Sequence, residues 1–215
     1  MGKIKYFVQQ SWLLIAASFA FGLLIAVANA SLEPRIKQNE KDKLDNLMKS
    51  LIGQAEDFQM AAEQVEVTGD KGKVEKTDIY KALDGNGKSI GFAFVAVGAG
   101  FADKIKLVIA VDGECEKFLG FKVLASNETP GFGSKIAIDT DESDIDFVDQ
   151  FKGALAGEVE LIKTGKIEVI KVIDSQIAAI SGATVSSEAV VKIFNTYTGE
   201  IKKQLQQKGL IGNGE

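Results

Sequence analysis

The chain contains no histidine and only one cysteine, Cys115, among its 215 residues. Without histidine it lacks the usual ligand of zinc and haem iron and the imidazole of most acid–base catalysts. One cysteine can form neither an internal disulfide nor an iron–sulfur cluster ligated wholly by cysteines of this chain. A hydrolase with a Ser–His or Cys–His pair is therefore excluded. Any redox role must come from a bound cofactor, and Cys115 is expected to be a small residue of the interior.

A basic stretch with interleaved aromatic residues is also missing. The chain has 25 Lys and Arg against 30 Asp and Glu, which gives a formal net charge of −5 at pH 7. Nucleic-acid binding is therefore not expected. Internal repeats and low-complexity segments are absent as well, and the length that follows the first apolar segment suits one soluble domain.

Charged side chains are absent from Tyr6 to Leu32. The central part, Trp12 to Ala30, consists mostly of Leu, Ile, Ala, Phe and Val. About 20 such residues are enough to span the apolar part of a bilayer. Residues 1–32 are therefore predicted to be a cytoplasmic N-terminus and a transmembrane helix.

The flanking charges predict the orientation of this helix. Lys3 and Lys5 precede it, and no acidic residue occurs before Glu33. This bias places the N-terminus in the cytoplasm and the rest of the chain outside, in a single pass through the plasma or inner membrane. The alternative is a cleaved signal peptide, because Ala28-Asn29-Ala30 fits a cleavage site. The apolar segment is longer than that of a typical signal peptide, so a retained anchor is expected.

The remaining chain predicts an α+β fold. Residues 33–76 are expected to form a juxtamembrane helix, Pro34 to Leu51, and a connector, and residues 77–215 a single domain. Strands are predicted at 78–83, 89–97, 104–111 and 118–125, the first two joined by the turn Asp84-Gly85-Asn86-Gly87. A short helix at 141–153 and a hairpin of 158–162 with 166–173 around Thr164-Gly165 should follow.

The segment Ser181-Gly182-Ala183-Thr184-Val185-Ser186-Ser187 leads directly into a helical pattern that continues to about Leu205. Apolar residues recur there at spacings of three and four, namely Val190, Ile193, Tyr197, Ile201 and Leu205. The first N–H groups of a helix have no acceptor within the helix, and the helix dipole adds partial positive charge beside them. The turn could therefore hold a phosphate. On spacing alone, Thr184 or Ser186 could instead be a simple N-cap.

Two motifs resemble those of the FMN-binding domain family. Ile180 to Ser187 resembles its flavinylation motif, in which FMN is joined through its phosphate to the last Thr of Ser/Thr-Gly-Ala-Thr. The loop Glu128-Thr129-Pro130-Gly131-Phe132-Gly133-Ser134-Lys135-Ile136 resembles the family's Glu-Thr-Pro-Gly-x-Gly loop. A weaker match is Gly98-Ala99-Gly100-Phe101, followed by Ile105 and a strand that ends at Val111-Asp112-Gly113. Together the matches cover about Tyr80 to Ile201.

The resemblance implies a cofactor, FMN, bound covalently to Thr184 by a phosphoester. A separate Mg-dependent flavin transferase would make this bond with FAD as donor, so Thr184 is an attachment point and no catalytic or metal-binding residue is expected. The residues implied around the phosphate are Ser181, Gly182, Ala183, Val185 and Ser186. Those implied along the isoalloxazine are Glu128, Thr129, Gly131, Phe132, Gly133 and Lys135, with Phe132 as an apolar wall. Flavin carries one or two electrons, which suits a relay.

One position departs from the family's pattern. The motif usually has Asp three residues before the Ser or Thr of Ser/Thr-Gly-Ala-Thr, but this chain has Ala178 there, and its nearest upstream acid is Asp174. A flavin-free, membrane-tethered assembly or binding module is therefore the alternative to a flavoprotein.

The layout of one N-terminal anchor and one FMN-binding domain resembles the G subunits of Rnf complexes, which move electrons between ferredoxin and NAD and translocate Na⁺ or H⁺. The resemblance implies the other membrane and peripheral subunits of such a complex as partners. The C subunits of Na⁺-translocating NADH:quinone reductases share this layout but are usually longer, and they remain the alternative.

Overall fold

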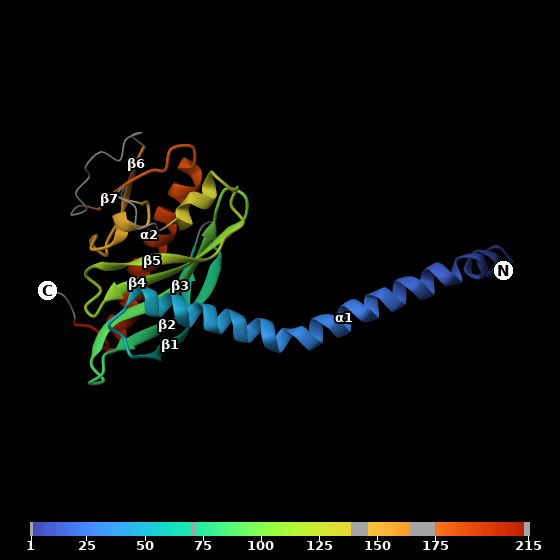
Figure 1. The fold of residues 1–215 in the computed structure, drawn as a ribbon, viewed down its shortest axis with the longest axis horizontal. Helices are drawn as coiled ribbons and strands as arrows, with labels where there is room; N and C mark the ends of the chain where they lie inside the picture. The colour runs from blue at the N-terminus through green and yellow to red at the C-terminus, as the bar shows by residue number, and fades with distance from the viewer. Residues whose placement is uncertain (1, 70–71, 139–145, 164–174, 213–215) are drawn as a thin grey trace. The chain divides into compact units, whose positions relative to one another are not determined.

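The computed structural model describes residues 2–69, 72–138, 146–163 and 175–212. The chain forms two compact units, Met1–Lys43 and Leu44–Glu215. The helices are α1 (Gly2–Leu51), the short 3-10 helices η2 (Gly133–Ala137) and η3 (Asp149–Phe151), and α2 (Thr184–Gln207). The strands are β1 (Asp57–Thr68), β2 (Val74–Leu83), β3 (Ser89–Ala99), β4 (Lys104–Asp112), β5 (Phe118–Ala125), β6 (Glu160–Ile162) and β7 (Gln176–Ala178) (Figure 1). The predicted α+β class is confirmed.

The first unit lies entirely within α1, which contains the apolar segment. By length and composition α1 is, among the described residues, the one helix able to cross a membrane, and an 18-residue window in it has a mean hydropathy of 2.2. The sequence predicted a second helix beginning at Pro34, but the structure has one continuous helix with Pro34 inside it. Proline removes one helical hydrogen bond. The residues around Pro34 favour the helix, however. Lys37 Nζ forms an ion pair with Glu33 Oε1 at 2.7 Å, one helical turn earlier.

The second unit contains a five-stranded antiparallel sheet with the order β1-β2-β3-β4-β5. The four strands expected between Asp78 and Ala125 are present with nearly the expected bounds, and the Asp84–Gly87 turn joins β2 to β3. The sequence did not predict β1, nor the start of β2 at Val74. The compact unit that contains this sheet begins at Leu44.

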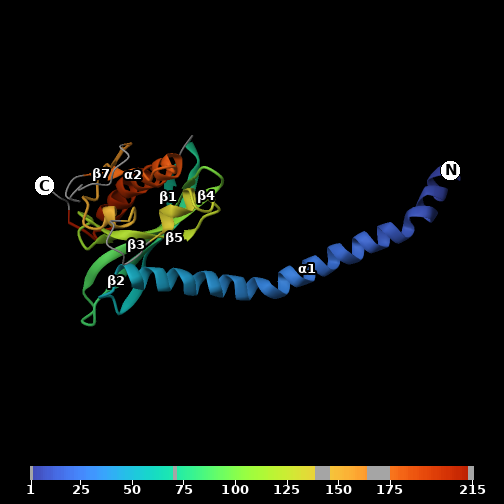
Figure 2. The same ribbon diagram turned by 45° about the horizontal axis from the view of Figure 1, so that its top comes forward.

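Both faces of the sheet are covered by apolar side chains. In β4 alternate residues point to opposite sides, so that Leu107 and Ile109 join the cluster under α2, whereas Val108 and Ala110 join a second cluster. This alternation is the period of two of a strand buried on both faces. Met48, from the last turns of α1, packs into the second cluster. Figure 2 shows α2 lying along one side of the sheet.

The core under α2 is aromatic. The Phe194 ring meets the Phe118 ring edge-on at 4.8 Å between centroids and the Phe121 ring at 5.4 Å. Phe151 of η3 completes the cluster, 4.4 Å from Phe194 and 4.9 Å from Phe121. Edge-to-face pairs of this kind are worth about 0.5–1.5 kcal/mol beyond their buried area. They hold α2, and therefore its N-terminal end, against the sheet.

The sequence did not predict the small second sheet. β6 pairs in parallel with β7, with Leu161 opposite Ile177. The expected partner, 166–173, and the Thr164-Gly165 turn lie outside the described residues. Of the helix expected at 141–153, the described part contains only the single turn η3, since residues 139–145 also lie outside it.

Candidate functional site

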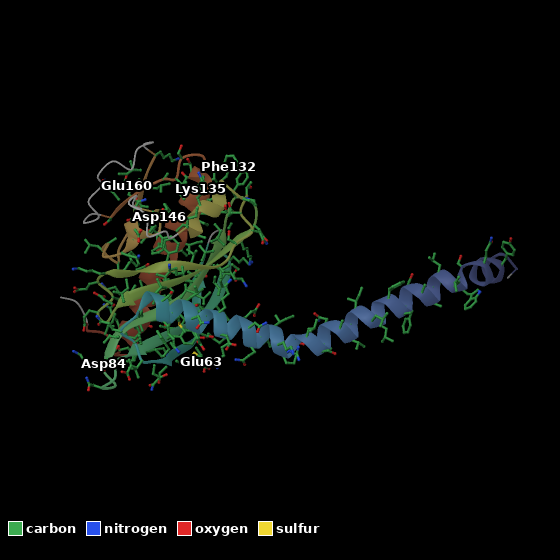
Figure 3. The ribbon with its side chains drawn as sticks, viewed as in Figure 1. Glu63, Asp84, Phe132, Lys135, Asp146 and Glu160 are labelled. Atoms are coloured by element: carbon green, nitrogen blue, oxygen red, sulfur yellow. The ribbon has the colours of Figure 1, made fainter. Side chains whose placement is uncertain are left out.

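Three separate segments line a pocket of ≈ 510 Å³. They are the loop between β3 and β4, the loop that follows β5, and the start of α2. The lining residues are Phe101, Glu128, Thr129, Phe132, Gly133, Gly182, Ala183, Thr184, Val185 and Ser186. Phe132 projects from the second of these loops (Figure 3). Both motifs that the sequence contains therefore meet at one place.

The helix α2 begins at Thr184, and its N-cap residue is Ala183, without a side-chain cap hydrogen bond. The alternative that Thr184 or Ser186 is an N-cap is therefore wrong. The N–H groups of the first turn have no acceptor within the helix, and the helix dipole gives this end partial positive charge. Thr184, half-buried, stands at the edge of the pocket beside these groups.

The turn before the helix depends on glycine and on a serine. Gly182 has φ +78°, a conformation that side-chain-bearing residues rarely adopt, and the ring of Phe132 lies next to it. Ser187 accepts a hydrogen bond from the Ile180 N–H at 3.1 Å and donates to the Ala183 carbonyl at 3.0 Å. These bonds close the turn and fix the direction in which Thr184 enters the pocket.

Glu128 is the buried centre of the site. Its Oε1 accepts the Ala102 N–H at 3.0 Å, and its Oε2 accepts the Ser186 hydroxyl at 2.5 Å. The residue is only 6% exposed. A Cβ at Gly133 would lie 2.5 Å from Oε2, so glycine is needed for the loop to close over the carboxylate. Glu128 thereby ties the three segments of the pocket together.

The structure brings most of the expected flavin residues together. Those that do not line the pocket are Ser181, Gly131 and Lys135. Gly131 instead shapes the loop, because its N–H donates to Ser134 Oγ at 2.9 Å. Lys135 is exposed and lies in η2 (Figure 3). Phe101 was not among the expected residues, although the Gly98-Ala99-Gly100-Phe101 match pointed to its loop.

Ala178, which stands where the family usually has an acid, lies in the interior of the domain. It is fully buried, its N–H donates to Gln150 Oε1 at 2.7 Å, and its carbonyl accepts from Gln150 Nε2 at 3.3 Å. Gln150 is itself 2% exposed. Asp174 lies outside the described residues.

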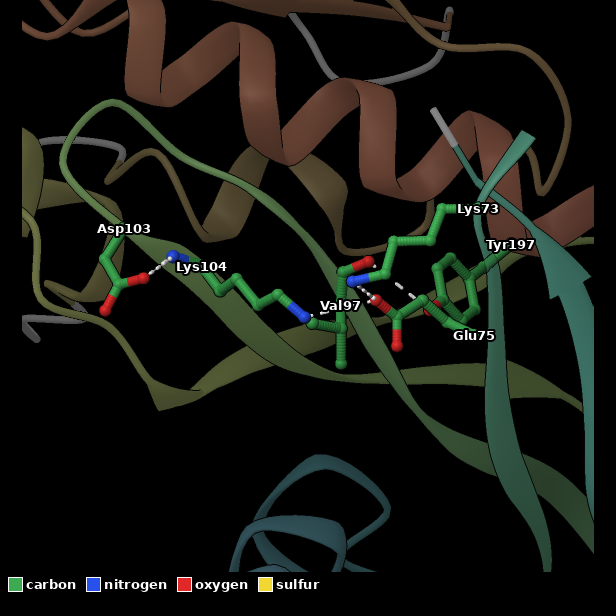
Figure 4. Close-up of polar contacts among 6 residues, drawn as sticks. All are labelled: Lys73, Glu75, Val97, Asp103, Lys104 and Tyr197. Carbon is green, nitrogen blue, oxygen red and sulfur yellow. Dashed lines mark hydrogen bonds and ion pairs between the residues drawn. The ribbon is translucent and has the colours of Figure 1, made fainter. Parts of the chain in front are cut away.

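A second pocket, of ≈ 310 Å³, lies farther along α2 and contains none of the expected residues. At its edge Glu75 Oε1 accepts from Lys73 at 3.0 Å and from Lys104 at 3.2 Å (Figure 4). The hydrogen bond from Lys73 is the main cause that lowers the pKa of Glu75, and Glu75 in turn raises the pKa of Lys73. This exposed ion network links β2 to β4 across β3, whose Val97 carbonyl accepts from the Tyr197 hydroxyl at 3.3 Å.

The residues of the first pocket fit a flavin nucleotide. A phosphate joined to Thr184 would lie beside the first-turn N–H groups, and the exposed Phe101, Phe132 and Val185 side chains offer apolar contacts to a flat ring. The volume lies within the range of about 300–1,000 Å³ typical of small-molecule sites.

Comparison with known proteins agrees with this geometry. The family model described as FMN-binding domain matches residues 100–198. The G subunit of the proton-translocating ferredoxin:NAD(+) oxidoreductase complex of Clostridium ljungdahlii is 30% identical over 176 residues, which are 81% of this chain and 80% of that one. The chain belongs to this family of G subunits. The G subunit of the ion-translocating oxidoreductase complex of Methanosarcina acetivorans is 26% identical over 194 residues, 89% of this chain and 92% of that one.

Two solved structures share the fold. The C subunit of the Na(+)-translocating NADH-quinone reductase of Parabacteroides distasonis has a TM-score of 0.53 at 22% identity, and the match covers 78% of this chain and 95% of that one. NqrC of Shewanella oneidensis has the same TM-score at 20% identity, with coverages of 72% and 73%. This chain thus has the fold of these C subunits.

Proposed function

We propose that this protein is the electron-relay subunit of a membrane-bound, ion-translocating ferredoxin:NAD oxidoreductase complex of the Rnf type, with FMN joined to Thr184 as a phosphoester. The observation that carries the proposal is the position of Thr184. It is the first residue of α2, has no capping role, and lines the pocket at the end of the helix whose first N–H groups have no acceptor within the helix.

The residues of the chain have distinct tasks in this function. The Thr184 hydroxyl oxygen forms the bond to the FMN phosphorus. A flavin transferase supplies FMN from FAD, so that the FAD pyrophosphate bond breaks, AMP leaves, and the hydroxyl proton goes to solvent. The N–H groups at the start of α2 hold the phosphate, and the pocket positions the ring. Bound FMN supplies the capacity to accept and donate one or two electrons.

The membrane helix would anchor this relay subunit in the membrane, next to the other subunits of its complex. The lysines before the apolar segment favour a cytoplasmic N-terminus and an extracytoplasmic domain. A covalent tether suits that side, because a lost cofactor could not be replaced from the cytoplasmic pool. The partners are the other membrane and peripheral subunits, which pass electrons to and from the flavin. The C subunit of a Na⁺-translocating NADH:quinone reductase is the alternative with the same fold.

Mass spectrometry of the full chain from its native membranes, under denaturing conditions, tests the proposal. We expect a mass increase of FMN less one water, mapped to the peptide that contains Thr184, and its loss in Thr184→Val. Thr68→Val is the matched control, because Thr68 is exposed on β1 and does not line the pocket, and it should retain the flavin. An unmodified Thr184 peptide from cells with an active flavin transferase would leave the flavin-free assembly module as the function. The subunits that copurify with the chain distinguish the two kinds of complex.

A further inference from the structure

The domain exposes few large apolar side chains, and three of them line one pocket. Among the described residues after Leu51, those exposed are Met60, Val74, Phe101, Phe132, Ile138, Leu155 and Val185. Phe101, Phe132 and Val185 all line the Thr184 pocket. The other phenylalanines of this part of the chain are buried or half-buried. Phe101 and Phe132 are 68% and 59% exposed, so two aromatic rings are held in solvent at the same site.

Backbone hydrogen bonds hold the two loops that carry these exposed side chains. Beside Phe101, the Gly100 N–H donates to the Asp103 carbonyl at 2.8 Å, and the Ala102 N–H donates to Glu128. The Phe132 N–H donates to the Thr129 carbonyl at 3.2 Å, and Gly133, which follows it, is buried. Contiguous apolar side chains at a concave site mark a surface that another group covers.

The charges of the pocket indicate the chemistry of the ligand that covers these apolar side chains. Among the described residues that line it, Glu128 has the only charged side chain, and both carboxylate oxygens already accept hydrogen bonds from Ala102 and Ser186. The pocket therefore offers aromatic and aliphatic faces to its ligand, and the N–H groups without a helical acceptor lie at the start of α2, where Thr184 stands. A flat, aromatic ring attached to a phosphate matches this division.

We propose that Phe101 and Phe132 together hold the isoalloxazine ring of the Thr184-bound flavin, with Phe101 as a ring-binding residue and Glu128 as the positioning residue that fixes the two loops. This inference rests on the proposed function, since it requires FMN on Thr184. The contacts restrict the motion of the ring and shield one part of it from solvent, while the covalent bond prevents its loss.

The experiment measures the mobility and the solvent exposure of the flavin ring. Full-length protein carrying FMN is solubilised in detergent, and the flavin's fluorescence anisotropy and its quenching by iodide are recorded for the wild type, Phe101→Leu, Phe101→Tyr and Phe132→Leu. Leu155→Ala is the control, because Leu155 is an exposed apolar residue that does not line the pocket. Intact mass first establishes that FMN is attached, and fluorescence then reports only the molecules that carry it.

Each outcome decides the inference. We expect Phe101→Leu and Phe132→Leu to lower the anisotropy and to raise the iodide quenching constant, the population of docked ring falling about two- to tenfold. Phe101→Tyr should retain the wild-type values, as should Leu155→Ala. Attached FMN with unchanged anisotropy and quenching in Phe101→Leu would overturn the inference, and so would complete loss of attachment in that variant. A wild-type chain without FMN would instead overturn the proposed function.

Discussion

The Ser186 hydroxyl donates a hydrogen bond to Glu128 Oε2 at 2.5 Å, and both residues are buried. Ser186 lies in the first turn of α2, whereas Glu128 begins the loop after β5. The bond therefore fixes the end of the helix that carries Thr184 against the loop that carries Phe132. Because Glu128 also accepts the Ala102 N–H, the loop of Phe101 is held by the same carboxylate.

Replacement of Glu128 should destabilise the domain. Glu128→Ala leaves the Ser186 hydroxyl and the Ala102 N–H without their acceptor, and each buried unpaired group costs about 1–3 kcal/mol. Urea unfolding of the full chain should give a correspondingly lower free energy of unfolding, with a lower flavinylated fraction by mass. Glu63→Ala is the control, because Glu63 is exposed (Figure 3). Equal stabilities of the two variants would contradict the role of Glu128.

The glycine that covers Glu128 should not tolerate a side chain. In Gly133→Ala the new Cβ would lie 2.5 Å from Glu128 Oε2 and 2.6 Å from Ser186 Oγ, so the loop must move. We expect a lower melting temperature and a lower flavinylated fraction. Gly199→Ala is the matched control, since Gly199 lies in α2 with no atom within 4 Å of the new Cβ. It should stabilise the helix by about 0.5–1 kcal/mol.

Introduction of the family's usual acid at position 178 should lower the stability of this chain. Ala178 is fully buried against Gln150, and Ala178→Asp would place a carboxyl group there without a cationic partner among the described contacts of that residue. A buried, unpaired polar group costs about 1–3 kcal/mol and an ionised one more. Thermal unfolding should show the loss. Ala125→Asp, at an exposed strand end, should change stability much less, and a gain in stability for Ala178→Asp would refute the prediction.

Cys115 should remain unreactive in the folded protein. Burial is the main cause that raises the pKa of its thiol from 9.0 to about 12, and Asp112 adds to the effect. A thiol reagent at pH 8 should therefore label the urea-unfolded chain and leave the folded chain unlabelled. Fast labelling of the folded chain would show that the thiol is accessible.

The raised pKa of the Cys115 thiol should make the stability of the domain depend on pH. The folded state binds this proton more tightly than the unfolded state, so the contribution of Cys115 is fully present below pH 9.0 and is lost as the pH rises toward about 12. The free energy of unfolding should fall over this range by up to about 1.4 kcal/mol per pH unit from this group. Cys115→Ala, measured by urea unfolding at several pH values, should have a shallower decline than the wild type.

The parts of the fold with regular patterns could be predicted from the sequence. Strands β3, β4 and β5 have strong apolar patterns, and α2 has apolar residues at helical spacing. β1 could not be predicted, because two register shifts, between Met60 and Ala62 and between Ala62 and Val65, interrupt its alternation. The parallel pairing of β6 with β7 depends on residues distant in sequence, and a three-residue strand carries no pattern that indicates its partner.

The site was predictable only through its motifs. Resemblance located Thr184 and the Glu128–Lys135 loop, but the sequence could not distinguish a residue that faces a ligand from one that supports the loop. Glu128 lines the pocket, and its carboxylate also accepts hydrogen bonds from Ser186 and Ala102, which the sequence did not predict. Contacts between residues far apart in the chain decide this difference, and no local pattern records them.

The dependence of the pocket on three distant segments determines when the protein can mature. The loops of Phe101 and Glu128 precede α2 in the chain, and Thr184 belongs to the last helix. The attachment site is complete only after α2 has packed on the sheet and Ser186 has reached Glu128. If FMN is joined to Thr184 as proposed, a transferase that recognises this arrangement would modify folded domains and not incomplete ones, so that flavinylation would report that folding is complete.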